Sequence, residues 1–86
     1  MRLEFRQRAF EDLQYWVQMN PKLAKRLLRL IEETKRDPFG GAGKPEPLRG
    51  ELSGWWSKRI DQEHRLVYRV EGNSLIVAQA RGHYDD

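Results

Sequence analysis

Apolar residues alternate with charged ones at the start of the chain and then change to a helical spacing. Between Met1 and Arg6, Leu3 and Phe5 alternate with Arg and Glu, a period of two that predicts a short half-buried strand at the edge of a sheet. From about Arg8 the spacing becomes helical, and one stripe is expected to face the core: Phe10, Leu13, Trp16 and Val17.

A second helix is predicted directly after the first. Asn20 and Pro21 fit an N-cap followed by proline at the first helical position, where its missing N–H costs nothing, and Pro38 disfavours helical backbone at Asp37. The apolar side of this helix consists of Leu23, Leu27, Leu30 and Ile31, and the remaining surface is basic, with Lys22, Lys25, Arg26 and Arg29. This basic face fits either plain solvation or contact with RNA phosphates or an acidic partner.

The second half of the chain predicts a loop followed by a β-meander. Phe39 to Pro47 is rich in glycine and proline, and no regular structure is expected there. Three segments beyond it are rich in aromatic and β-branched residues: Trp55 to Ile60, Arg65 to Val70 and Leu75 to Ala80. Gly72 and Asn73 form a turn between the last two. Residues 1–86 are therefore predicted to form one α+β domain, with two helices packed on a twisted antiparallel β-sheet.

Composition narrows the functional classes. Sixteen Lys and Arg against 13 Asp and Glu give a net charge of +3, which suits a polyanionic partner but also an ordinary surface of mixed charge. The absence of cysteine excludes disulfides and thiolate metal sites and favours a reducing cytoplasm. No apolar run approaches the ~20 residues needed to cross a bilayer, so we expect a cytoplasmic protein that does not act at a membrane.

Familiar catalytic motifs are missing from the chain. His64 and His83 lack paired metal-ligand spacing, and there is neither a nucleophile elbow nor a phosphate loop. What remains is a metal-free set of acid, base and cation: Glu46, Arg59, Arg65, His83 and Tyr84. These types suit RNA cleavage, because RNA supplies its own nucleophile, the 2′-hydroxyl. Taken singly, each also fits a solvated loop, sheet-surface or tail position. Trp55 and Trp56 fit either base stacking or the core, whereas Trp16 is expected in the core.

The joint pattern is more specific than any one residue. It consists of Lys44–Leu48, Leu52–Gly54, Trp56–Ile60, Glu63–Tyr68, His83 and Tyr84. With these motifs the chain resembles the YoeB (Txe) family within the RelE toxin superfamily, over nearly its whole length. The resemblance implies a RelE-like fold and a ribosome-dependent mRNA interferase that uses no cofactor.

The same resemblance implies roles for individual residues. Glu46 would act as the general base and His83 as the general acid, while Arg65 would stabilise the scissile phosphate and Tyr84 would help to position the substrate. Three further cations would bind RNA: Lys44, Arg59 and Arg49, the last standing where the family has a lysine. That exchange keeps the charge but changes its geometry.

Partners are implied as well. A YefM-like antitoxin would inhibit the protein through a disordered acidic and apolar segment that folds on binding. The ribosome and mRNA would be its target, a homodimer is compatible with the family, and operator DNA would be reached only through the antitoxin complex. Three other hypotheses stay open: a ParE-like toxin that blocks a topoisomerase, a non-catalytic RNA-binding module, and a protein that acts mainly as a corepressor.

Strand register tests whether the candidate residues can meet. A three-residue turn at Asp61 to Glu63 would place Arg59 opposite Arg65 on one sheet face. A two-residue turn at Gly72 and Asn73 would put His83 on the other face. A cluster therefore needs a bulge or a strand end, for which Gly82 is the candidate.

Overall fold

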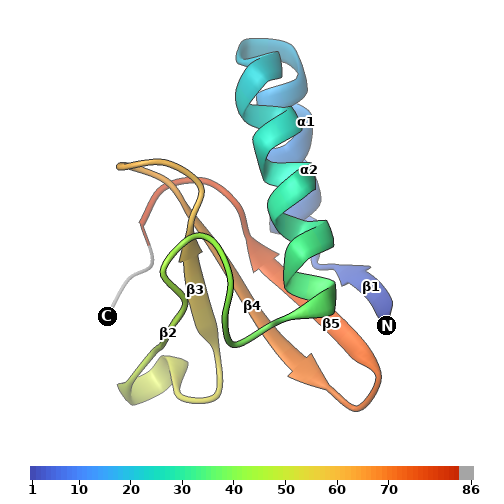
Figure 1. The fold of residues 1–86 in the computed structure, drawn as a ribbon. Helices are drawn as coiled ribbons and strands as arrows, with labels where there is room; N and C mark the ends of the chain where they lie inside the picture. The colour runs from blue at the N-terminus through green and yellow to red at the C-terminus, as the bar shows by residue number, and fades with distance from the viewer. Residues whose placement is uncertain (84–86) are drawn as a thin grey trace.

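The computed structural model describes residues 1–83 and shows two helices packed on a five-stranded sheet (Figure 1). In chain order the elements are β1 (Arg2–Phe5), α1 (Gln7–Met19), α2 (Pro21–Arg36), β2 (Glu46–Pro47), the 3₁₀ helix η1 (Gly50–Leu52), β3 (Trp56–Arg59), β4 (Arg65–Glu71) and β5 (Ser74–Gln79). The strand order across the sheet is β1-β5-β4-β3-β2. The predicted α+β class, with two helices on a sheet, is confirmed.

The sheet is mixed, not wholly antiparallel as the sequence predicted. β5, β4, β3 and β2 pair antiparallel in turn, but β1 runs parallel to β5, with Arg2 opposite Ser74 and Phe5 opposite Val77. The connection permits this pairing, because β1 and β5 are joined not by a tight hairpin but by a long stretch that contains both helices and the other three strands. β1 is an edge strand, as predicted.

The second helix begins and ends where the sequence indicates. The side-chain oxygen of Asn20 accepts a hydrogen bond from the Leu23 N–H at 3.2 Å, Pro21 follows, and α2 ends at Arg36. All four predicted apolar positions of α2 are buried, and the four predicted cations are exposed. The predicted amphipathic pattern of this helix is confirmed.

The buried face of α1 differs from the predicted stripe. Trp16 is in the core, as predicted, but Phe10 and Val17 are 48% and 55% exposed. The positions of α1 that are buried or half-buried are Ala9, Asp12, Leu13, Tyr15 and Trp16. The apolar pattern misses Asp12, which is buried because its carboxylate accepts a hydrogen bond from the backbone N–H of Ala80 at 2.9 Å.

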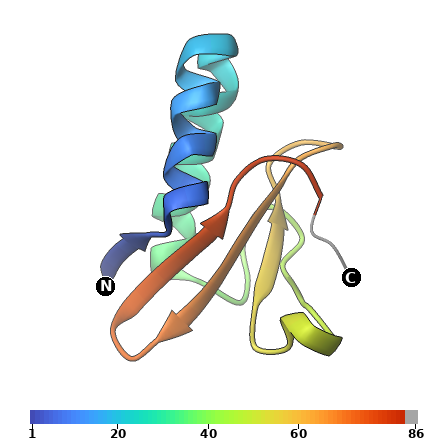
Figure 2. The ribbon, with the colours of Figure 1, turned by 180° about the vertical axis from the view of Figure 1, so that it is seen from behind.

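The core lies between the helices and one face of the sheet. Four fully buried side chains of β4 and β5 meet the helices there: Leu66, Tyr68, Leu75 and Val77. Each such side chain stabilises the fold by roughly 1.5–3 kcal/mol relative to exposure. The second view agrees that α1 and α2 lie side by side (Figure 2). Neither helix in residues 1–83 has the length and apolar character to span a membrane.

The loop from Phe39 to Pro47 is not wholly irregular, which corrects the prediction from its glycines and prolines. Its last two residues form β2, with Glu46 opposite Ser57 and Pro47 opposite Trp56 in β3. A proline is tolerated here because β2 is an edge strand with one neighbour. A two-residue strand that contains proline leaves no periodic signal in the sequence.

Candidate active site

The sheet face away from the helices brings several predicted residues together. Directly opposed residues of neighbouring strands share a face, as do residues two apart along a strand. Glu46 lies opposite Ser57, and Arg59 lies opposite Arg65. These four residues therefore share one face of the sheet, which we call the open face. Leu66, the residue after Arg65 in β4, points to the opposite face and into the core. The predicted pairing of Arg59 with Arg65 is confirmed.

Backbone contacts hold the Glu46 segment, residues 43–47, against β3. The carbonyl oxygen of Gly43 accepts a hydrogen bond from the Arg59 N–H at 2.7 Å. A Cβ atom at position 43 would lie 3.0 Å from the Lys58 Cβ and 3.1 Å from the Arg59 carbonyl oxygen, and φ is +91°. Glycine suits this approach, because any side chain would be strained at this φ and would force its neighbours to shift. Lys44 follows, exposed and with φ of +52°, a left-handed conformation that is costly for a side-chain-bearing residue.

A buried lysine contacts the start of the loop that leads into this segment, from the helix side of the sheet. Lys58 is 1% exposed, and its Nζ donates a hydrogen bond to the carbonyl oxygen of Asp37 at 3.2 Å. Burial lowers the pKa of Lys58, although the nearby charges of Asp37 and Glu33 act to raise it. Nothing in the apolar pattern predicts this role, because a lysine on a strand normally points to solvent.

The guanidinium group of Arg65 is held by the turn between β3 and β4. Its Nη1 donates to the carbonyl oxygens of Asp61, Gln62 and His64 at 3.1, 3.3 and 3.2 Å. Asp61 shapes this turn by accepting from the N–H groups of Glu63 and His64 at 2.8 and 2.6 Å. Burial acts to raise the pKa of Asp61, but these hydrogen bonds, together with the nearby charges of His64 and Arg26, outweigh burial and lower the pKa. A cation fixed in this way is preorganised to stabilise phosphate charge.

His83 lies beyond β5 and is exposed. The adjacent residues Val67 and Tyr68 of β4 pair with residues two apart in β5, which leaves Ala78 as a one-residue bulge. Gly82, with φ of +79°, lies after the strand has ended. The predicted change of face thus involves both a bulge and a strand end, but the bulge is at Ala78 rather than at Gly82.

Side chains of α1 hold the C-terminal segment, residues 80–83. The N–H of Ala80 donates to Asp12, and the carbonyl oxygen of Ala80 accepts from the indole N–H of Trp16 at 2.8 Å. Arg8 donates to the carbonyl oxygen of Arg81 at 3.1 Å and also lies 3.5 Å from Asp12. The sequence did not predict these contacts between α1 and the C-terminal segment. The one sequence feature that could have indicated them is Asp12, a carboxylate at helical spacing among apolar residues.

Gly82 joins the C-terminal segment to the start of β4 and the residue just before it. Its carbonyl oxygen accepts from the Arg65 N–H at 3.0 Å, and its N–H donates to His64 Nδ1 at 2.8 Å. The Gln79 side chain donates to the carbonyl oxygen of His83 at 2.8 Å. Figure 2 shows this segment, in red, curving over the end of the sheet toward the β3–β4 turn. His83 is therefore brought to the end of the open face where Arg65 lies.

The remaining candidates are less closely placed. Lys44 is exposed beside Glu46, Arg49 is exposed just before η1, and Tyr84 lies outside the described residues. Within residues 1–83 no three His, Asp or Glu side chains gather as a potential metal site.

The two tryptophans that the sequence left open have different surroundings. The guanidinium carbons of Arg6 and Arg69 lie 5.3 and 4.8 Å from the Trp55 ring centroid. Trp56 instead packs against Phe39, with ring centroids 4.8 Å apart, and against the core. Core packing is therefore shown for Trp56, and cation contact for Trp55.

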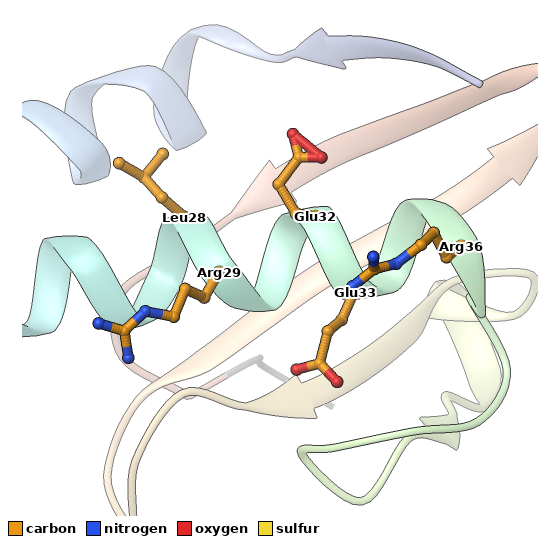
Figure 3. A pocket seen from close by; sticks show the side chains of 5 residues that line it. All are labelled: Leu28, Arg29, Glu32, Glu33 and Arg36. Carbon is orange, nitrogen blue, oxygen red and sulfur yellow. The ribbon is translucent and has the colours of Figure 1, made fainter.

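Two hollows lie along α2. One, of about 400 Å³, is lined by Leu28, Arg29, Glu32, Glu33 and Arg36, and Figure 3 shows both carboxylates projecting from the same stretch of helix as the arginines. Its mixed charge suits RNA phosphates poorly. The other, of about 320 Å³, lies between α2, the loop and β3, and its charged lining consists of three arginines and one carboxylate: Arg26, Arg29, Arg59 and Glu33. This second hollow links the basic face of α2 to a cation of the candidate site.

Comparisons with known proteins agree on one family. The profile described as YoeB-like toxin of bacterial type II toxin-antitoxin system matches residues 5–84. The toxin YoeB of Streptomyces coelicolor is 51% identical over 84 residues, covering 98% of this chain and all of that protein. A solved structure named YoeB/ParE toxin from Agrobacterium tumefaciens is 43% identical, with a TM-score of 0.94 over 98% of this chain and all of that one.

Two solved Staphylococcus aureus structures add assemblies of related proteins. A YoeB–YefM complex is 40% identical to this chain and a YoeB dimer is 39% identical, each with a TM-score of 0.89 and 98% of both chains covered. The family match and the relative's identity extend over almost the whole chain. The protein therefore belongs to the YoeB-like toxins of bacterial type II toxin–antitoxin systems.

Proposed function

We propose that this toxin is an endoribonuclease that cuts mRNA on the ribosome without a metal and is held inactive by an antitoxin. One observation carries the proposal: strand register places Glu46, Arg59 and Arg65 on the open face, and the Gly82 hydrogen bonds bring His83 to its end. A carboxylate, an imidazole and two guanidinium groups can supply the base, the acid and the positive charge that cleavage by the 2′-hydroxyl needs.

The bond changes and proton transfers of the proposed reaction use groups of the chain and the RNA. Glu46 takes the proton of the 2′-hydroxyl, whose oxygen forms a bond to the adjacent phosphorus. The bond from phosphorus to the 5′-oxygen breaks, which leaves a 2′,3′-cyclic phosphate, and His83 donates a proton to the departing 5′-oxygen. Arg65 and Arg59 stabilise the extra negative charge on the phosphate as it forms. Tyr84 is assigned to substrate positioning by the family resemblance alone.

The basic surface beside the open face suits the RNA backbone. Arg59 lines the hollow that also contains Arg26 and Arg29, so cations continue from the candidate site toward the exposed lysines of α2. Lys44 and Arg49 would add contacts on the Glu46 side. Each phosphate contact should make binding depend on salt, and neutralising one cation should lower the slope of log K against log salt by about 0.7 for single-stranded RNA.

The proposed regulator is a YefM-like antitoxin, by analogy with the Staphylococcus aureus complex. A homodimer is proposed by analogy with the dimer from the same organism. Contact with operator DNA would arise only in the toxin–antitoxin complex, and a corepressor role there is compatible with cleavage.

The test is a cleavage assay on ribosomes programmed with a defined mRNA, with the same RNA free in solution as a parallel sample. We expect a discrete cut only on the ribosome. His83→Ala and Glu46→Gln should slow it by about 10²- to 10⁴-fold and leave ribosome binding nearly intact. Glu51→Gln is the matched control, since Glu51 is another exposed carboxylate on the chain between β2 and β3.

Other outcomes would favour the other hypotheses. Intact mRNA on ribosomes that bind the protein would support a non-catalytic RNA-binding module. Inhibition of a purified topoisomerase without any RNA cleavage would support ParE-like action, a distinction worth testing because one solved relative carries both names. Equal loss of binding and cleavage in folded Glu46→Gln would remove Glu46 from the chemistry.

A further inference from the structure

His64 occupies a position next to the candidate site that the acid–base scheme does not use. Its side chain is 16% exposed, and Nδ1 accepts a hydrogen bond from the Gly82 N–H at 2.8 Å. A backbone N–H can only donate, so Nδ1 carries no proton here, and the neutral ring has its proton on Nε2. Nε2 faces the Glu63 carboxylate at 3.9 Å.

The imidazole of His64 packs against a side chain of α1. Trp16 packs edge-to-face against it, with ring centroids 4.6 Å apart. The indole N–H of the same Trp16 donates to the carbonyl oxygen of Ala80, two residues before Gly82. One buried aromatic side chain therefore supports both the ring that accepts the hydrogen bond and the segment that donates it.

Gly82 needs such an external restraint. It has φ of +79°, and a glycine carries no side chain whose packing could fix its conformation. Its own hydrogen bonds go to His64 and Arg65, and the Gln79 side chain donates to the carbonyl oxygens of its two neighbours, Arg81 and His83. Glycine has the widest choice of backbone conformations, so loss of the His64 bond would widen the range of orientations open to His83.

We propose that His64 is a positioning residue, which fixes Gly82 through Nδ1 and so sets where His83 stands relative to the phosphate held at Arg65. The inference rests on the proposed function of the open face. His64 does not touch substrate in this scheme. Its loss should therefore lower kcat more than it raises KM, because it orients a reacting group rather than binding RNA.

Two substitutions separate the hydrogen bond from the bulk of the ring. His64→Leu removes the acceptor and keeps much of the apolar volume, whereas His64→Asn places an amide oxygen close to the position of Nδ1. In the programmed-ribosome assay we expect His64→Leu to lower kcat by about 10- to 100-fold, with KM little changed. His64→Asn should restore most of that loss.

Two further measurements tie the effect to His83. In a His83→Ala background, His64→Leu should cause no additional loss, because residues that act through one another are non-additive. Amide hydrogen exchange, which does not depend on activity, should show Gly82 protected in the wild type and His64→Asn but exposed in His64→Leu. If His64→Leu does not fold, His64→Gln serves as the second variant that lacks an acceptor at the Nδ1 position.

The outcomes distinguish the two proposals. Normal cleavage by His83→Ala would overturn the proposed acid and this inference with it. Lost cleavage in His83→Ala, combined with normal kcat in folded His64→Leu, would overturn only the positioning role. Equal loss from His64→Leu in the wild-type and His83→Ala backgrounds would also overturn it, since His64 would then act by another route.

Discussion

The two segments that carry the proposed base and acid are both short and irregular, yet they are held by different kinds of contact. The Glu46 segment is fixed by backbone: the β2 pairing with β3 and the bond between Gly43 and Arg59. The C-terminal segment is fixed largely by side chains, through Asp12 and Trp16 of α1 and through His64.

This difference has consequences for mutation. Backbone pairing survives most side-chain replacements and fails only where the close approach itself is blocked. A segment gripped by side chains can be loosened by single substitutions on distant elements, with no change to the residues that contact the RNA. The C-terminal segment, which carries the proposed acid His83, should thus be displaced by single substitutions more easily than the Glu46 segment.

The largest expected effect comes from Trp16→Ala. The substitution removes a buried aromatic ring and its bond to Ala80, and it should lower the free energy of unfolding by about 3–5 kcal/mol. Phe10→Ala, at an exposed position of the same helix, should stay within about 0.5 kcal/mol. Urea unfolding measures both. In Trp16→Ala, the rate of amide exchange should rise more at Gly82 than at Arg59. An equal rise would contradict the idea that side chains hold the C-terminal segment and backbone pairing holds the Glu46 segment.

Gly43→Ala should disturb the base side by a smaller amount. Strain at positive φ and the contacts with Lys58 and Arg59 together should cost about 2–4 kcal/mol. Gly54→Ala is the matched control, because φ there is +94° but nothing lies within 4 Å of the added Cβ. It should cost about 1 kcal/mol. Identical unfolding midpoints for the two variants would show that the close approach at Gly43 is unimportant.

Lys44→Gly should act in the opposite direction on stability. Removing the left-handed strain at φ of +52° should raise the free energy of unfolding by about 0.5–1 kcal/mol, after the greater freedom of the unfolded chain is subtracted. Loss of the charge should weaken RNA binding. Lys44→Gln keeps the strain but loses the charge, so calorimetry and salt-dependent binding on both variants separate the two effects. Equal stability of the two would argue against strain.

Asp61 gives the smallest expected effect, because its carboxylate remains partly exposed. Its pKa is lowered in the folded protein, so its contribution is present above the usual value of 3.8 and lost as the pH falls through the folded value. Asp61→Asn should remove this part of the acid dependence. Urea midpoints measured from about pH 6 down to pH 3 test this. Parallel curves for the two proteins would show that Asp61 makes no such contribution.

The sequence predicts the parts of the fold that follow a period, and it misses those that depend on contacts between distant segments. The caps and apolar side of α2 and the pairing of Arg59 with Arg65 follow from local rules. The apolar pattern does not predict that Asp12 is buried, because the partner of its carboxylate, the Ala80 N–H, is 68 residues away in the sequence. The β2 pairing of Glu46 is hidden by prolines, and the bulge at Ala78 has no glycine to mark it.

The candidate site shows the same division. Residue types and motifs predict which side chains to consider, but not what holds them. Lys58 under the loop and His64 against Gly82 look like surface polar residues in the sequence, since burial depends on which elements pack over them. The partners that fix these side chains belong to other elements and cannot be found from spacing along the chain.

The parallel pairing of β1 with β5 also bears on when the fold can form. Residues 2–5 find their sheet partners only at residues 74–77, so this contact closes a loop of nearly the whole chain and raises the contact order. During synthesis, Glu46, Arg59 and Arg65 all emerge before β5 does. A nascent chain interrupted before β5 therefore carries the proposed base and both cations, but neither the strand that anchors β1 nor the segment that bears His83.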